Sequence, residues 1–332
     1  MKRVLVVCPG RGSYGREQLR SMQPSPSVTE ADAFRRSLGR PSPTEMDAAD
    51  AYSSRLHVAG ENASILTMAA SLADADRLAN VSVIAVVGNS MGWYTALAVA
   101  GALPLADALR LVETMGQYQV ENVIGGQVIY PLVDDAWRPL PCPELSAALA
   151  EIPDLFPSIH LGGQAVVGGS TAAIAALMKR LPPRKMGERE APMQLPLHSA
   201  FHTPLMAGTA ARAHADLSDL TWTAPRVPLI DGRGAIYRPR SADPADLSAY
   251  TLGSQVTEPY DFRKGLTVAI REYAPDAIVL LGPGGNLGGA VAQTLISEGW
   301  RGLHSRSDFL RLQAEDPFVL SMARPEQRAA VT

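Results

Sequence analysis

The sequence predicts an α/β protein in which a mainly parallel sheet is covered by helices and interrupted by a smaller α+β unit. Three observations indicate this fold class. Short apolar runs alternate with helical segments, a glycine-rich turn links one such run to a helix, and the middle of the chain has a different pattern of strands and helices. The expected strands of the large sheet are residues 4–8, 83–87, 227–231 and 277–281, with a weaker one at 301–304. Continuous apolar runs bounded by Gly or Pro are typical of parallel strands that are buried on both faces.

Helical segments lie between these runs. They are expected at residues 31–38, 46–57, 63–78, 94–99, 105–119, 204–217, 261–273 and 287–298. In the middle of the chain, strands are expected at 127–133, 164–168 and 193–197, and helices at 144–152 and 172–180. This order of strands and helices predicts a small α+β insert of ferredoxin-like type.

The sequence therefore predicts a discontinuous large domain and an inserted small one. Residues 1–121 and 198–312 form the expected α/β-hydrolase-like catalytic domain, and 122–197 form the ferredoxin-like subdomain. The polar segment 313–332 is expected to be a loosely held C-terminal tail.

Composition excludes several classes of function. The 332 residues are 46% hydrophobic and 19% charged, with a net charge of −3 and no basic block, so nucleic acid is not an expected partner. The apolar start ends at Pro9, which favours a first strand over a signal peptide, and no apolar run is long enough to span a membrane. Cys8 and Cys142 show neither a metal-binding nor a redox spacing. We expect a cytoplasmic protein without a bound metal.

Ser90 is the first candidate functional residue. It stands in Gly88-Asn89-Ser90-Met91-Gly92, after an apolar strand and before a helix. This strand–turn–helix context makes the G-x-S-x-G pattern a nucleophile elbow, in which a sharp turn exposes the serine above the end of the strand. The helix N-terminus then directs free backbone N–H groups at the reacting centre.

Two competing motifs are less informative. His198 and His202 have the spacing of a zinc-binding pair, but Pro196 and Pro204 break the helix that such a pair requires, so His198 is expected to be structural. The G-x-G-x-x-G at residues 10–15 lacks the second strand with an acidic end that a dinucleotide site requires.

Further strings resemble the malonyl-CoA:acyl carrier protein transacylases and the acyltransferase domains of polyketide synthases. The elbow and a Ser-Ala-Phe-His-Thr-Pro-Leu-Met string are similar in sequence and separation to that family's serine and histidine motifs. The other similar segments are Pro9-Gly10-Arg11-Gly12-Ser13, residues 162–169, Gln255-Val256-Thr257-Glu258-Pro259 and Leu281-Gly282-Pro283-Gly284. The resemblance thus extends along nearly the whole chain and implies membership of a divergent branch.

The resemblance implies a ping-pong S-acyl transfer in fatty acid or polyketide biosynthesis. Ser90 would attack the thioester of an acyl-CoA with His202 as general base, and a phosphopantetheine thiol of an acyl carrier protein would accept the acyl group. A backbone carbonyl rather than an Asp would orient His202. The backbone N–H groups of Met91 and Arg11 would form the oxyanion hole, Gln255 would line the site, and no cofactor would be needed.

Departures from the family pattern concern the acyl group. Met115 occupies the position of the arginine that binds the free carboxylate of malonate, and a thioether cannot replace a guanidinium. A neutral acyl group against Met115 is favoured, with Arg11 as an alternative receptor for the carboxylate. Asn89 and Trp93 indicate a reshaped pocket, and Phe201 resembles the small-substrate form of the histidine motif.

Two other functions are compatible with the same residues. An acyl carrier protein hydrolase would pass the acyl-serine to water instead of a thiol. A non-catalytic homologue that only docks carrier proteins is disfavoured, because both Ser90 and His202 are present.

Overall fold

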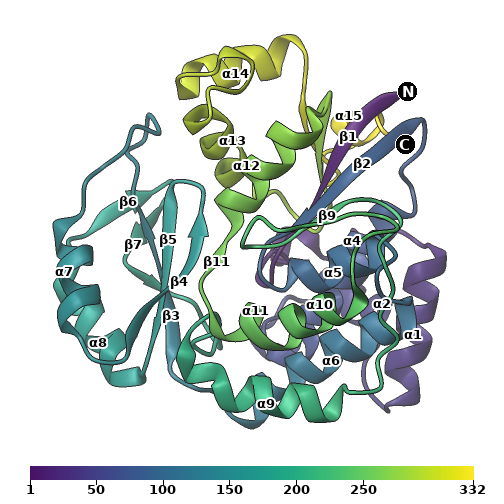
Figure 1. Cartoon of the computed structure of the whole chain (residues 1–332), viewed down its shortest axis with the longest axis horizontal. Coiled ribbons are helices and arrows are strands. Elements are labelled where there is room, and N and C mark those ends of the chain that lie inside the picture. Colours follow the sequence, from purple (N-terminus) through teal and green to yellow (C-terminus); the bar gives the residue numbers. More distant parts are fainter.

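The computed structural model describes residues 1–332 and contains two main sheets, one in a large unit and one in a small unit (Figure 1). The large sheet has the strand order β10-β9-β2-β1-β12-β13. All neighbouring pairs in it are parallel except β9 and β10. Its strands are β1 (Lys2–Cys8), β2 (Val81–Gly88), β9 (Leu229–Ile230), β10 (Ile236–Tyr237), β12 (Ala277–Leu280) and β13 (Val319–Ser321). This sheet and the inserted smaller unit confirm the predicted α/β fold class.

Helices cover both faces of the large sheet, as its apolar strands require. Figure 1 shows the helices before residue 122 on one side of β1 and β2, and those between residues 262 and 315 on the other. The first group is α1 (Pro26–Ser37), α2 (Pro43–Asp47), α3 (Ser54–His57), α4 (Gly60–Ala75), α5 (Gly92–Val99) and α6 (Leu105–Glu121). The second is α12 (Phe262–Tyr273), α13 (Gly288–Ser297) and α14 (Arg306–Glu315).

One predicted helix is divided in two. Residues 46–57 were expected to be continuous, but the chain forms α2 and α3 with a loop between them. Each short helix begins at its own serine cap. The Ser42 side chain accepts a hydrogen bond from the N–H of Glu45, and Ser53 does the same for Leu56. The second cap, inside the expected helix, favours a new start over continuation.

The small unit is an antiparallel sheet with two helices on its outer face (Figure 1). Its elements are β3 (Gly126–Pro131), α7 (Pro143–Glu151), β4 (Leu155–Leu161), β5 (Gln164–Gly169), α8 (Thr171–Arg180) and β8 (Met193–Gln194), with a hairpin of β6 (Arg184–Met186) and β7 (Arg189–Ala191). The order β4-β5-β3-β8 is that of a ferredoxin-like sheet. The sequence analysis missed β4, because Pro157 and His160 interrupt its apolar pattern.

A strand from outside residues 122–197 completes the small sheet. β11 (Tyr260–Asp261) pairs in parallel with Ile159 and His160 of β4. It follows the segment α9 (Ala207–Asp216), α10 (Pro244–Ala249), a π-helical turn (Tyr250–Ser254) and α11 (Gln255–Thr257). The predicted boundary between the two units therefore omits one strand of the smaller sheet.

Two predictions about the C-terminal region are wrong. Residues 301–304 do not form a strand; a 3-10 turn at Trp300–Gly302 takes their place. Residues 313–332 are not a loose tail, because β13 is the edge strand of the large sheet and pairs with β12. Phe318, Leu320 and Val331 are each at most 3% exposed. These scattered apolar residues give too short a pattern to mark a strand by periodicity.

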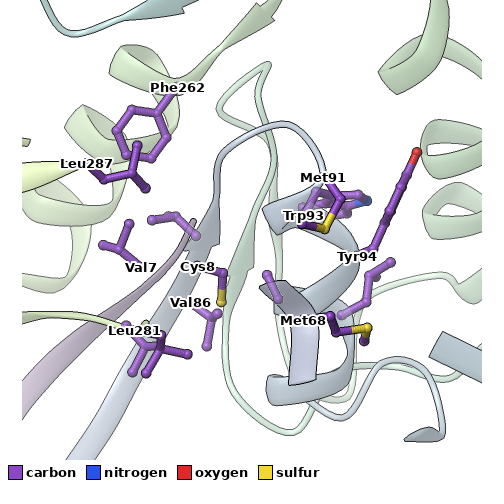
Figure 2. Close-up of a cluster of buried hydrophobic side chains, with 14 of the residues drawn as sticks. Val7, Cys8, Met68, Val86, Met91, Trp93, Tyr94, Phe262, Leu281 and Leu287 are labelled. Carbon is purple, nitrogen blue, oxygen red and sulfur yellow. The ribbon is translucent and has the colours of Figure 1, made fainter. Parts of the chain in front are cut away.

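The main core surrounds the ends of β1 and β2. Figure 2 shows Cys8 and Val86 beside Met91, Trp93 and Tyr94, which belong to the turn and helix after β2. Trp93 is fully buried, and its indole N–H donates to the Thr251 hydroxyl at 2.8 Å. The carboxyl end of β2 is thus held between the core and the π-helical turn.

Candidate active site

Ser90 lies on a strained turn at the carboxyl end of β2. Its φ angle is +54°, a left-handed conformation that non-glycine residues seldom adopt. The turn is tight enough that a Cβ on Gly92 would lie 2.2 Å from the carbonyl oxygen of Cys8, and one on Gly88 would lie 2.3 Å from the backbone of Gly92. Only glycine fits at both positions, which is the physical reason for the G-x-S-x-G spacing.

His202 completes a serine–histidine pair. The distance from Ser90 Oγ to His202 Nε2 is 2.7 Å, and the other ring nitrogen, Nδ1, lies 2.6 Å from the carbonyl oxygen of Gln255. Since a carbonyl oxygen only accepts, Nδ1 carries the proton and Nε2 is left free to accept the hydroxyl proton of Ser90. The structure therefore brings together the two residues that the sequence analysis selected as nucleophile and base.

Burial sets the protonation state of this histidine. His202 is 1% exposed, and desolvation lowers its pKa to about 4, although the Gln255 carbonyl opposes the shift. No carboxylate is hydrogen-bonded to the ring. The imidazole is consequently neutral at physiological pH, which is the form that a general base requires.

Gln255 supports the serine–histidine pair with its side chain as well. Its Oε1 accepts a hydrogen bond from the Tyr94 hydroxyl at 3.0 Å, and its Nε2 donates to the carbonyl oxygen of Ser90 at 3.2 Å. The residue was expected to line a substrate pocket. Its amide group is hydrogen-bonded to the elbow, so one residue contacts both the serine backbone and the histidine ring, and its contact with substrate stays a prediction.

Two backbone N–H groups in the loops after β1 and β2 have no acceptor in the protein. They belong to Met91, which follows the nucleophile, and to Arg11, in the loop after β1. β1 and β2 are neighbouring parallel strands, so these loops emerge at the same edge of the sheet. Uncommitted N–H groups at such an edge are suited to an oxyanion.

The predicted substrate-binding residues lie in different environments. Met115 is 2% exposed within the main core. Asn89 is buried in the elbow, and its Oδ1 has no hydrogen-bond partner. Phe201 is partly buried, with its ring 6.2 Å from that of His202. Contact of these side chains with an acyl group stays a prediction.

Tyr260 is a site residue that the sequence analysis missed. Its hydroxyl donates to the carbonyl oxygen of Gly88 at 2.6 Å, and its ring centroid is 5.4 Å from that of His202. It thus contacts the elbow and the base simultaneously. Its position directly after the Gln255–Pro259 string could have indicated this role. A large aromatic side chain there would lie close to the residues that the string contacts.

His198 is the other histidine of the spacing that a zinc-binding pair would have. It lies in the loop after β8, where its Nδ1 is 2.9 Å from the Pro196 carbonyl oxygen. Burial and the positive charge of Arg11 lower its pKa to about 3, so it is neutral. The structure contains no group of three or more His, Cys, Asp or Glu side chains that could hold a metal ion.

The fold and the site together define an α/β protein with a serine nucleophile elbow, a histidine held by a backbone carbonyl and a ferredoxin-like insert. A family model described as the acyl transferase domain matches residues 58–327, and the chain belongs to this family. None of its helices has the length and apolar character needed to traverse a bilayer.

Several relatives carry transacylase names. The chain is 32% identical over 147 residues to a malonyl CoA-acyl carrier protein transacylase of Salmonella typhimurium, a match that covers 43% of this chain and about half (46%) of that relative. It is 28% identical over 259 residues to the protein of the same name in Mycobacterium bovis, covering 73% of this chain and 78% of the relative. The crystal structure of the Synechocystis malonyl-CoA:ACP transacylase superposes with a TM-score of 0.74 at 20% identity, covering all of both chains.

Proposed function

We propose that this protein is an S-acyltransferase that moves a small, neutral acyl group from coenzyme A to an acyl carrier protein. The observation that carries the proposal is the 2.7 Å contact between Ser90 Oγ and His202 Nε2. The names of the relatives support the donor and the acceptor, since they describe acyl transfer to a carrier protein.

The first half-reaction uses the neutral histidine. Ser90 Oγ attacks the thioester carbonyl carbon while its proton moves to His202 Nε2. The negative charge on the carbonyl oxygen is held by the N–H groups of Met91 and Arg11, each such donor contributing about 3–4 kcal/mol to lowering the barrier. The C–S bond then breaks, and the proton on Nε2 passes to the departing coenzyme A sulfur.

The second half-reaction reverses these steps with a different thiol. The phosphopantetheine thiol of the carrier protein gives its proton to His202 Nε2 and attacks the acyl-serine carbonyl carbon. The C–O bond breaks, and the same proton returns to Ser90 Oγ. The net result is exchange of one thioester for another, with no oxidant, reductant or metal required.

The surroundings of Met115 and Arg11, the two candidate receptors for a substrate carboxylate, support a neutral acyl group. Met115 is buried in the apolar core and offers no donor. Arg11 donates from its two terminal nitrogens to protein acceptors, and its Nε is buried away from solvent. A buried malonate carboxylate would therefore be an unpaired charge, which costs several kcal/mol.

Intact-protein mass spectrometry tests the proposal. The protein is incubated with acetyl-, propionyl- or malonyl-CoA, and peptide mapping locates the adduct. We expect acetyl and propionyl adducts on Ser90 that form faster than a malonyl adduct, and none in Ser90→Ala. Absence of any adduct on wild-type protein, under conditions where it is folded, would refute acyl transfer.

Addition of carrier protein then separates transfer from hydrolysis. A transferase holds its acyl-serine until holo-carrier protein arrives, and the acyl group then appears on the carrier. A hydrolase on the same fold would lose the adduct to water at the same rate with or without the carrier, and that outcome would replace the proposed acceptor.

A further inference from the structure

The guanidinium of Arg11 joins three segments that are distant in sequence. It donates to the Val58 carbonyl at 3.0 Å, to the Leu197 carbonyl at 2.6 Å and to Oε1 of Gln119. Val58 precedes α4, Gln119 lies in the last turn of α6, and Leu197 belongs to the linker between β8 and His202. One side chain therefore ties the loop after β1 to the large unit's helices and to the segment that carries the base.

The backbone of the same residue supplies one of the two uncommitted N–H groups in the loops after β1 and β2. That N–H has no acceptor in the protein, whereas both terminal nitrogens of the guanidinium have one. Fixing the side chain at several points restricts how the Arg11 backbone can move. The position of an oxyanion donor is thus coupled to the position of the His202 segment.

Leu197, which accepts one of these bonds, has an unusual backbone conformation. Its φ angle is +55°, a left-handed conformation that is unfavourable for a non-glycine residue, and the residue is 50% exposed. The Leu197 side chain is therefore not stabilised by burial in this conformation, while its carbonyl oxygen accepts a charge-assisted hydrogen bond. The bond from Arg11 therefore offsets the cost of the strained turn five residues before His202.

The Arg11 guanidinium remains charged in the folded protein. Burial lowers the pKa of Arg11 to about 10, and the Glu61 carboxylate opposes that shift. Arg11 is therefore still a cation at neutral pH. Its charge adds to the larger effect of burial in lowering the pKa of the nearby His198. Only Nε of the guanidinium lacks a partner, and it is buried.

We propose that the Arg11 side chain is a positioning residue that fixes the oxyanion N–H of its own backbone relative to Ser90 and His202. This inference rests on the proposed acyl-transfer function. It assigns the guanidinium to the protein's own carbonyl groups instead of to a substrate carboxylate or to the phosphates of coenzyme A.

The test separates positioning from substrate binding. Arg11→Met removes the hydrogen bonds and the charge, whereas Arg11→Lys keeps the charge but cannot reach several acceptors at once. Arg20→Met is the control, because Arg20 lies on the surface in an exposed pair with Asp50. The readouts are the rate of Ser90 labelling by a fluorophosphonate probe, and kcat and KM for acetyl transfer from acetyl-CoA to holo-carrier protein. The probe carries neither coenzyme A nor a carboxylate, so it reports on the elbow alone.

We expect Arg11→Met and Arg11→Lys to slow labelling and lower kcat by up to roughly 100-fold, the effect of displacing a reacting group by about 1 Å. The KM for acetyl-CoA should stay within about threefold of wild type, and free guanidinium should partly restore Arg11→Ala. Normal labelling in both variants would overturn the inference. It would also be overturned if Arg11→Met raised the KM for acetyl-CoA without changing kcat and Arg11→Lys restored the wild-type KM.

Folding is monitored by urea denaturation. If Arg11→Met does not fold, Gln119→Leu removes one acceptor and should give a smaller slowing of labelling in the same direction; unchanged labelling there would also overturn the inference. Failure of wild-type protein to acquire any acyl group on Ser90 would instead refute the proposed function.

Discussion

The carbonyl oxygen of Gln255 accepts the Nδ1 proton of His202 at 2.6 Å, in the place where many serine–histidine sites have a carboxylate. A carbonyl fixes the tautomer and the orientation of the ring, but it adds no negative charge. The imidazole is therefore directed without being made strongly basic. Burial lowers the pKa of the ring, and the hydrogen bond to the Gln255 carbonyl opposes that shift only in part.

Replacing Gln255 by Ala should damage both stability and acylation. The change leaves the buried Tyr94 hydroxyl without a partner, and it removes one of the two hydrogen bonds to the Ser90 carbonyl, which also accepts from the N–H of Trp93. An unpaired buried polar group costs about 1–3 kcal/mol, so we expect a loss of that order in the free energy of unfolding. Gln255→Glu, which keeps the acceptor for Tyr94 but loses the donor to Ser90, should be intermediate in acylation rate. Equal rates for wild type and both variants would show that the side chain does not support the elbow.

The pH dependence of Ser90 acylation should be flat near neutrality and fall only in acid. Only the neutral form of His202 accepts a proton, and that form persists until the pH falls through about 4. Acylation rates in rapid-mixing experiments between pH 5.5 and 8 should consequently vary little. A rate that halves near pH 6.5, the ordinary histidine pKa, would contradict the burial that the structure shows.

Stability should respond to the same titration in a defined direction. The unfolded histidine binds a proton near pH 6.5, while the folded one stays neutral until about pH 4. Within this window the unfolded state binds more protons, so the contribution of His202 to the free energy of unfolding falls as the pH decreases. A comparison of wild type with His202→Gln by urea denaturation at several pH values measures this contribution, and an equal pH dependence of the two proteins would contradict it.

Tyr260→Phe should slow acylation more than its effect on stability explains. The substitution removes the hydroxyl that donates to the Gly88 carbonyl at the start of the elbow. Tyr130→Phe is the matched control, because Tyr130 donates to the Pro182 carbonyl at 2.8 Å within the small unit. Both should lower the free energy of unfolding by about 1–3 kcal/mol, and only Tyr260→Phe should slow fluorophosphonate labelling of Ser90. Similar labelling of the two variants would remove Tyr260 from the site.

Gly92→Ala should prevent the elbow from packing against β1. The added Cβ would lie 2.2 Å from the Cys8 carbonyl oxygen, and that atom belongs to the buried backbone of the sheet. We expect little folded protein by circular dichroism or, if it folds, an unlabelled Ser90. Gly289→Ala in α13, where no atom lies within 4 Å of the added Cβ, should be neutral or stabilising by about 0.5–1 kcal/mol.

Sequence reasoning located the chemistry better than the contacts that support it. Ser90 stands in a string whose spacing is fixed by local geometry, and His202 stands in one that resembles a family motif, so both residues could be selected without a structure. Tyr260 acts through a carbonyl on β2, and Arg11 acts through carbonyls on two other segments. Any residue can supply a carbonyl, and therefore no pattern marks such acceptors.

The errors in the fold have a similar origin. β13 is only three residues long, and its place in the large sheet depends on pairing with a strand about 40 positions earlier in the chain. β4 contains a proline and alternates irregularly, and it is defined by its pairing with β5. Strands of this kind are specified by their neighbours rather than by their own periodicity.

The pairing of β11 with β4 has a consequence for how the protein can be divided. Expressed alone, residues 122–197 would expose the outer edge of β4, whose N–H and C=O groups are satisfied in the whole chain by Tyr260 and its neighbour. A free edge of this kind readily recruits other strands. We therefore expect an isolated insert to self-associate unless Tyr260 and Asp261, the two residues of β11, are kept with it.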